Sequence, residues 1–253
     1  RFSAGTCFAG SALETANLSR NSIATLVRSS GVTLAAHHPL LRHLDLSRNR
    51  IDTIPAGAFA GLAFLETLDL SHNLLKSLAP LTAGDGAGGG GDSGANGSSS
   101  LRALTPLRAT NNRLSDVSGL DALACLGTLD LTANHINTAA ALASCFALRC
   151  LGLAENALEA MVEVDFLKNL ELLENLDLSR NPIIAGGIAG KKEDEPGSPR
   201  SLANMYRARV LYRLPRLTAL DGSPVSAHEK VEAMNALGDD VLHRQEVRAC
   251  VCT

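Results

Sequence analysis

Three polar residues, Asp45, Asp69 and His72, have side chains that could carry out acid–base chemistry together if the fold brought them close. Acid–base catalysis needs groups that are sheltered from water and whose pKa values are tuned to the reaction. All three fall in segments that we expect to lie on an open sheet, which excludes little water. The sequence also lacks a nucleophile elbow and a Walker loop. We therefore expect no enzyme, no catalytic residues and no small-molecule substrate.

Cysteine and glycine could supply other chemistry. The six Cys residues show no CxxC pair with partner ligands at zinc spacing, so we expect no metal site and free thiols in a reducing compartment. The ending Cys250–Thr253 has a Cys four residues from the end, but no polybasic segment precedes it and Thr is atypical for prenylation. The Gly-rich tract 84–100 is not followed by Lys-Ser/Thr as in a phosphate loop, so we expect a flexible insert and no cofactor-binding residues.

Asparagine recurs at the same slot of a repeated segment, LxxLxLxxNx followed by Leu or Ile, and in two weaker copies Ala16 and Ala109 stand in a Leu slot. The seven copies begin at Leu13, Leu41, Leu65, Leu104, Leu126, Leu148 and Leu173. Their asparagines are Asn21, Asn49, Asn73, Asn112, Asn134, Asn156 and Asn181. The spacing between them is 28, 24, 39, 22, 22 and 25 residues, and removing the 17-residue tract 84–100 from the longest step returns it to 22. The tract therefore interrupts a regular array.

The elements that must position these residues follow from the pattern. Leucines at the first, fourth and sixth slots would point inward from a short strand and the bend after it. A single unit cannot bury that face, so neighbouring units must stack. Each Asn amide could then bond the backbone of the adjacent coils and form a buried ladder. Amphipathic helices are the alternative, but helical spacing does not predict an Asn at one slot seven times.

The C-terminal part departs from the repeat. Apolar residues at helical spacing predict a helix over 201–214, and Leu217–Gly222 resembles a last half-repeat. A capping box, Ser226–Glu229, predicts a further helix to about residue 249 with an apolar stripe that either packs back on the cap or docks a partner. The expected organisation is seven repeats in 1–183 with the insert 84–100, a charged Gly/Pro loop at 184–200, a cap at 201–225, and a helix and tail at 226–253.

The repeat and the cap together resemble a known family. The chain is similar to cytosolic leucine-rich-repeat proteins of the 22-residue class over roughly residues 11–225. The segment YRARVLYRLPRLTALDG, residues 206–222, resembles the C-terminal cap of that class. The resemblance implies an α/β leucine-rich-repeat solenoid with a curved parallel sheet on the concave face and helices or 3₁₀ turns on the convex face. We expect Phe59, Phe146 and Phe166 to pack on that convex side.

Net charge, aromatic content and hydrophobic patterning indicate which kind of molecule the chain binds. The net charge is −3 and only 3% of the residues are aromatic, which disfavours direct binding of nucleic acid. The sequence has no stretch of 18 uncharged apolar residues, so we expect no membrane span, and residues 1–10 lack a signal-peptide layout. The expected partners are therefore other proteins in a larger complex.

Residues between the repeated leucines form two candidate rows on the concave surface. One row occupies the slot between the second and third Leu and is mainly Asp, and the other occupies the slot before Asn and is basic at both ends. Surface residues typical of such repeats, without a partner, are the alternative. The predicted partner-binding residues are His43, Asp45, Arg48, Asp69, His72, Arg108, Asp130, Glu155, Asp177 and Arg180.

The resemblance also suggests a biological setting. Short cytosolic arrays with this cap resemble structural and regulatory parts of cilia and flagella, so we predict a non-enzymatic scaffold of an axonemal assembly in the cytoplasm. A regulatory subunit of a phosphatase, or a protein-binding subunit of a spliceosomal ribonucleoprotein in the nucleus, is the alternative. An extracellular recognition array is disfavoured because flanking Cys pairs are lacking.

Overall fold

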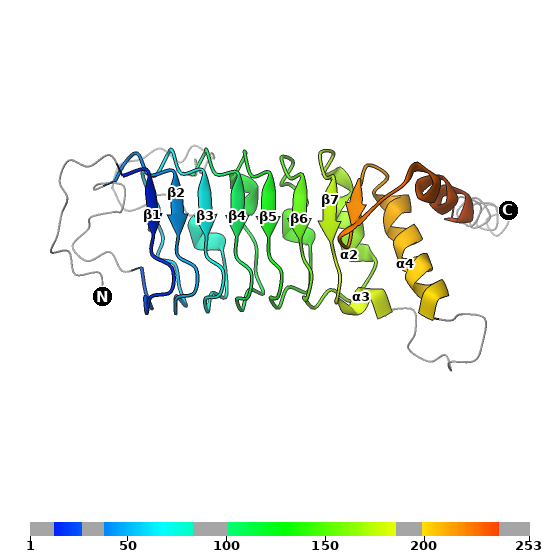
Figure 1. Cartoon of the computed structure of the whole chain (residues 1–253), viewed down its shortest axis with the longest axis horizontal. Coiled ribbons are helices and arrows are strands. Elements are labelled where there is room, and N and C mark those ends of the chain that lie inside the picture. The colour runs from blue at the N-terminus through cyan, green and yellow to red at the C-terminus, as the bar shows by residue number, and fades with distance from the viewer. Residues whose placement is uncertain (1–12, 27–37, 83–100, 186–198, 238–253) are drawn as a thin grey trace, which may run out of the picture.

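The chain winds into one elongated solenoid whose strands stand side by side in chain order (Figure 1). The computed structural model describes residues 13–26, 38–82, 101–185 and 199–237. The strands are β1 (Thr15–Asn17), β2 (His43–Asp45), β3 (Thr67–Asp69), β4 (Pro106–Arg108), β5 (Thr128–Asp130), β6 (Cys150–Gly152), β7 (Asn175–Asp177), β8 (Ala219–Leu220) and β9 (Ser223–Pro224). Neighbouring strands from β1 to β8 pair in parallel, and β9 turns back antiparallel on β8. The leucine-rich-repeat solenoid predicted from the sequence is confirmed.

In β2 to β7 the middle residue of the strand is a buried repeat leucine, and the two outer residues are less buried. The middle residues lie opposite one another across the sheet, as in the pairs Leu44 with Leu68 and Leu129 with Leu151. Leu107, Leu129 and Leu220 are completely buried. Ala16 occupies this position in β1 and is only half-buried, so the first coil is the least tightly packed of the array.

The core is a continuous column of leucines that runs the length of the solenoid. The first and sixth slots contribute side chains with no exposed surface, such as Leu41 and Leu46 in one coil and Leu65 and Leu70 in the next. Truncating one such leucine to alanine costs about 2–5 kcal/mol, because the cavity left behind collapses only in part. Stability therefore comes from contacts between neighbouring coils more than from any coil alone.

Six of the seven repeat asparagines are buried and connect adjacent coils. Asn134 is typical: its Nδ2 donates to the carbonyls of Leu131 in its own coil, at 2.8 Å, and Ala109 in the preceding coil, at 3.0 Å. Its Oδ1 accepts the backbone N–H of Leu114 at 3.0 Å. The same set of bonds is made by Asn49, Asn73, Asn112, Asn156 and Asn181. Asn21 is exposed and bonds only carbonyls of its own turn among the described residues.

The return segments on the convex side contain short helical turns. These are η2 (Ala79–Leu81), η3 (Leu120–Ala122), η4 (Ala140–Leu142), α2 (Val162–Asp165) and η5 (Phe166–Asn169). The segment 55–62 forms turns on the same side. Phe59 is buried there, but Phe146 and Phe166 are 61% and 36% exposed, so the expectation that all three phenylalanines pack on the convex side is wrong. Leucines of the repeat already fill the core beneath the two exposed rings.

Two helices and a hairpin close the C-terminal end. α3 (Pro182–Ala185) follows the last repeat Asn directly, and α4 (Pro199–Arg213) begins two residues before the predicted helix. Val210, Leu211 and Leu214 of this region are buried against the last coil. Residues 227–237 form a further helix that begins where the capping box predicts. Figure 1 shows these helices gathered at the end of the solenoid opposite β1.

Some predictions fall outside the described residues: the flexible insert 84–100, most of the loop 184–200, and the C-terminal helix beyond residue 237. In the part of the chain that the structure describes, no helix is both long and apolar enough to cross a membrane.

Candidate protein-binding surface

The predicted binding residues lie in two separate rows, one on the strands and one in the turns. Asp45, Asp69, Arg108, Asp130 and Asp177 are the last residues of β2, β3, β4, β5 and β7. Strand pairing places Asp45 opposite Asp69, Asp69 opposite Arg108, and Arg108 opposite Asp130. The strand row is thus an in-register line of charges across the sheet.

Each aspartate of the strand row also stabilises the turn that follows it. Oδ1 of Asp45 accepts the backbone N–H of Ser47 at 2.9 Å, and Oδ1 of Asp69 accepts that of Ser71 at 2.8 Å. Asp130 and Asp177 make the same bond to the residue two positions on. A carboxylate offers about four acceptor positions, so this local bond leaves most of its hydrogen-bonding capacity for a partner. The row therefore combines a folding role with a surface that can still bind.

A hollow of about 310 Å³ lies over β1–β4, and the strand row crosses it. Its polar lining includes Asn17, His43, Asp45, Asp69 and Arg108. Nδ1 of His43 lies 2.9 Å from Oγ1 of Thr67 on the neighbouring strand, which fixes the orientation of the imidazole ring. The hollow therefore brings together hydrogen-bond donors, hydrogen-bond acceptors, and side chains of both charge signs on the concave face.

Two residues interrupt the acidic character of the strand row. Arg108 is exposed on β4 between the aspartates of β3 and β5. Gly152 on β6 has no side chain, and a Cβ placed there would lie 2.8 Å from Oδ1 of Asp130. The Asp130 carboxylate therefore occupies the space that a side chain at position 152 would need. Its Oδ1 also accepts the hydroxyl of Thr132 at 2.7 Å.

The residues before each repeat Asn form the turn row, which lies beyond the ends of the strands. Arg48, His72, Glu155 and Arg180 have φ between 54° and 58°, in the left-handed region, and all four are exposed. Arg180 pairs with Glu155 of the preceding coil. The prediction placed both rows on the concave sheet, whereas the structure places the second row in the turns beyond the strands.

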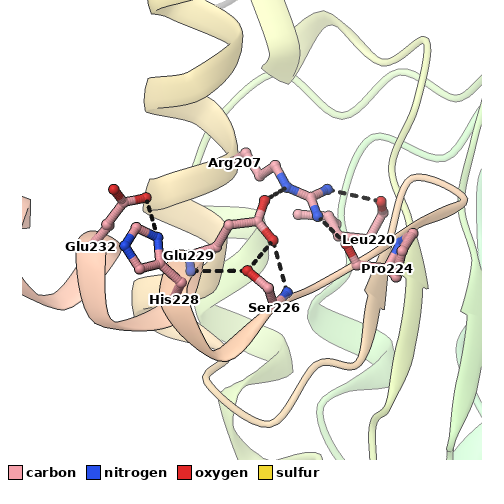
Figure 2. Close-up of polar contacts among 7 residues, drawn as sticks. All are labelled: Arg207, Leu220, Pro224, Ser226, His228, Glu229 and Glu232. Carbon is pink, nitrogen blue, oxygen red and sulfur yellow. Dashed lines mark hydrogen bonds and ion pairs between the residues drawn. The ribbon is translucent and has the colours of Figure 1, made fainter.

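Arg207 of α4 ties the last hairpin to the C-terminal helix (Figure 2). Its Nε donates to Oε1 of Glu229 at 2.9 Å, while its other two nitrogens donate to the carbonyls of Leu220 and Pro224. Ser226 and Glu229 form the reciprocal bonds of a capping box, and these contacts lower the pKa of Glu229, with Arg207 the main cause. The helix 227–237 is therefore anchored at its beginning.

Of the described residues of the apolar stripe predicted for this helix, Val231 and Met234 are exposed and Leu237 is half-buried. Val231 and Met234 are 55% and 51% exposed, whereas Ala233 on another face is buried. Of the two alternatives for the stripe, packing on the cap does not hold for Val231 and Met234, because the ion pair of Arg207 with Glu229 holds the helix with a different face inward.

Asp221 has a structural role that the sequence analysis missed. Its Oδ1 accepts the backbone N–H of Leu178 at 2.8 Å. In the other coils the corresponding N–H donates to the backbone carbonyl of a strand-row residue, as the N–H of Leu46 does to the carbonyl of Asp69. Burial raises the pKa of Asp221 above its ordinary value, although the Leu178 N–H opposes the shift. Its alignment with the aspartates of the strand row, followed by Gly222, was the available signal.

The described residues contain no group of three or more His, Cys, Asp or Glu side chains that could hold a metal ion. Cys145 is buried, and burial followed by the nearby Asp121 raises the pKa of its thiol to about 11. A thiol with so high a pKa is a poor nucleophile at neutral pH.

Known proteins resemble this chain in sequence and in fold. A family model described as leucine rich repeat matches residues 39–83. The chain is 30% identical over 137 residues to human cilia- and flagella-associated protein 410, covering 54% of this chain and 48% of that protein. It is 32% identical over 138 residues to human leucine-rich melanocyte differentiation-associated protein, covering 54% and 57%. A crystal structure of internalin C2 from Listeria monocytogenes superposes with a TM-score of 0.50 at 19% identity, covering 82% of this chain and 79% of internalin C2.

The stacked coils, the asparagine ladder and these matches define the class of protein. The chain has a leucine-rich-repeat fold, and this fold is of a type whose curved surface serves protein interaction. In sequence it resembles leucine-rich-repeat proteins of cilia and flagella. The chain spans about half the length of the two human relatives described above.

Proposed function

We propose that this protein is a non-enzymatic scaffold in a ciliary or flagellar axonemal assembly in the cytoplasm, and that it binds its protein partner on the concave sheet. The observation that carries the proposal is the strand row, an in-register line of Asp45, Asp69, Arg108 and Asp130 on a rigid sheet. The ciliary setting is supported by the similarity to cilia- and flagella-associated protein 410 of human and mouse.

The surface suits recognition of a protein for two physical reasons. The sheet is held rigid by the asparagine ladder, so binding does not have to order the site. The strand row is mainly acidic with one basic residue, Arg108, and this pattern favours a partner of complementary charge and suppresses others. Nucleic acid is disfavoured as a direct partner because the strand row is mainly acidic.

The test removes charge from the strand row without disturbing the fold. In the variant Asp45→Asn, Asp69→Asn, Asp130→Asn each amide oxygen can still accept the turn N–H that the carboxylate accepts. The matched control Asp121→Asn, Glu159→Gln, Glu171→Gln removes the same number of exposed acidic groups elsewhere. Full-length tagged chains are expressed in a ciliated cell, and the salt-resistant axonemal fraction is measured.

We expect the wild type and the control in the axonemal fraction, and the strand-row variant depleted from it at least fivefold. Absence of the wild type from cilia would refute the ciliary assignment, and equal retention of all three would refute the concave site. Stable association with a phosphatase catalytic subunit or with splicing proteins in the nucleus would favour the alternative assignments.

A further inference from the structure

The turns that follow the strands carry a strongly uneven charge. In the first four coils these turns, residues 19–24, 47–52, 71–76 and 110–115, hold five Arg or Lys residues against one acidic residue, Asp52. In the last three coils, residues 132–137, 154–159 and 179–184, they hold Arg180 against Glu155 and Glu159. We define the basic turn ridge as Arg20, Arg48, Arg50, His72, Lys76 and Arg113.

The ridge is a continuous feature because neighbouring turns are hydrogen-bonded to one another. The N–H of Arg48 donates to the carbonyl of Ser71, and the N–H of Arg113 donates to that of Leu75. All six ridge side chains are exposed. Within the described residues none of the five Arg and Lys side chains forms an ion pair, in contrast to Arg42, Arg149 and Arg180 elsewhere on the solenoid.

The backbone indicates that folding alone does not select these residues. Arg20 and Arg48 have φ of 55° and 54°, a conformation that Asn and Gly adopt more readily than Arg. Ala133 and Glu155 have φ of 58° and 55° at this slot in later coils, so the backbone does not require a basic residue there. Asn111 shows that the position accepts the favoured residue. Residues that oppose a local preference without a packing gain are concentrated at functional sites.

We propose that the basic turn ridge is a docking surface for an acidic polypeptide segment of the partner. Stacked coils lie about 4.8 Å apart, so four coils span roughly 14 Å, which an extended segment of about four or five residues covers. Arginine forks bind carboxylates with two parallel hydrogen bonds. This inference rests on the proposed function only in that the partner is a protein.

The strand row decides between an acidic polypeptide and a nucleic acid. Asp45 and Asp69 lie on the same coils as Arg48 and His72, and they would repel a uniformly charged phosphate backbone. A polypeptide can place acidic side chains on the ridge and basic ones over the strand row.

The test measures fluorescence anisotropy of a labelled decaglutamate peptide with the full chain. The ridge variant is Arg48→Asn, Arg50→Gln, Arg113→Gln, and the matched control Arg149→Gln, Lys168→Gln, Arg216→Gln removes the same charge from sites outside the ridge. Three exposed ion pairs of ordinary strength correspond to roughly a tenfold change in affinity. We therefore expect the ridge variant to bind about tenfold more weakly, the control to bind within twofold of wild type, and raised salt to weaken binding of the wild type.

Equal weakening of the control, or no binding by the wild type, would overturn the inference. Tighter binding of a labelled oligouridylate than of decaglutamate would replace it with a nucleic-acid surface. If the peptide does not bind while the strand-row variant is still lost from the axoneme, the ridge inference is refuted and the proposed function stands. If the peptide binds as expected while the strand-row variant stays in the axoneme, only the proposed function is refuted.

Discussion

At the scale of single residues, Asp221 shows how the repeat is brought to an end. In the other coils the backbone carbonyl of the strand-row residue accepts an N–H of the preceding coil. At the last coil the chain instead reverses direction through Asp221 and Gly222, both with positive φ. The Asp221 carboxylate takes the place of that carbonyl and bonds Leu178. Close by lies Tyr206, which is buried and whose hydroxyl has no hydrogen-bond partner meeting standard geometry among the described residues.

We predict that Asp221→Asn stabilises the protein at neutral pH. The folded-state pKa of Asp221 is raised, so the group contributes stability below its unfolded-state pKa, and that contribution is lost as the pH rises through the folded-state pKa. Asn keeps the acceptor for Leu178 without the buried charge, so its advantage should be largest at pH 7 and shrink on acidification, as thermal melts between pH 7 and pH 3.5 would show.

The control variant is Asp221→Ala, which leaves the Leu178 N–H without an acceptor and should cost about 1–3 kcal/mol at both ends of the pH range. An advantage of Asn that does not change with pH would show that its backbone preference, and not the removed charge, is responsible.

At the scale of elements, the last helix is positioned by one side chain. Arg207 reaches the hairpin carbonyls of Leu220 and Pro224 and the Glu229 carboxylate at the start of helix 227–237. The core beneath does not depend on these contacts, because leucines such as Leu217 and Leu220 fill it. The helix is therefore attached to the solenoid more weakly than the coils are attached to one another.

We predict that Arg207→Met releases the helix and leaves the coils intact. Hydrogen exchange followed by mass spectrometry should become at least tenfold faster over 226–237 and stay unchanged over 126–136. Arg216→Met, which removes a bond to the carbonyl of Glu171 on the outside of the last coil, is the matched control and should leave 226–237 protected. Unchanged exchange in the Arg207 variant would contradict the anchoring role.

At the scale of the whole molecule, each coil contacts only its neighbours, so the position of a defect decides its consequence. Asn134→Ala removes amide bonds to Leu131 and Ala109 and leaves the Leu114 N–H without an acceptor in the middle of the array. We expect a loss of about 2–4 kcal/mol in the free energy of unfolding, measured in urea. Asn21→Ala, at the exposed end, should cost less than about 1 kcal/mol. Similar costs at both sites would show that the ladder does not couple the coils.

The sequence predicted the coils because their leucines and asparagines repeat at fixed slots, and periodic signals survive without knowledge of distant contacts. The sequence predicted Arg48 and His72 in a row apart from the strand aspartates, but not that this row lies in turns, because slot spacing does not reveal a left-handed backbone at the slot before Asn. The orientation of Val231 and Met234 was missed for a related reason. Helical spacing identifies an apolar face but not the tertiary contacts that orient it. Here the contacts of Arg207 with Glu229 and the hairpin hold the helix with that face outward.

The two ends of the sheet differ in a way that matters for engineering. At one end, β9 reverses the direction of pairing, and Pro224 has no N–H with which to continue the ladder of strands. At the other end of the described residues, β1 pairs in parallel with β2, and Asn21 of the same coil bonds only carbonyls of its own turn. A consensus repeat that replaces residues 1–12 should therefore extend the array by parallel pairing with β1, whereas a repeat added after β9 should not.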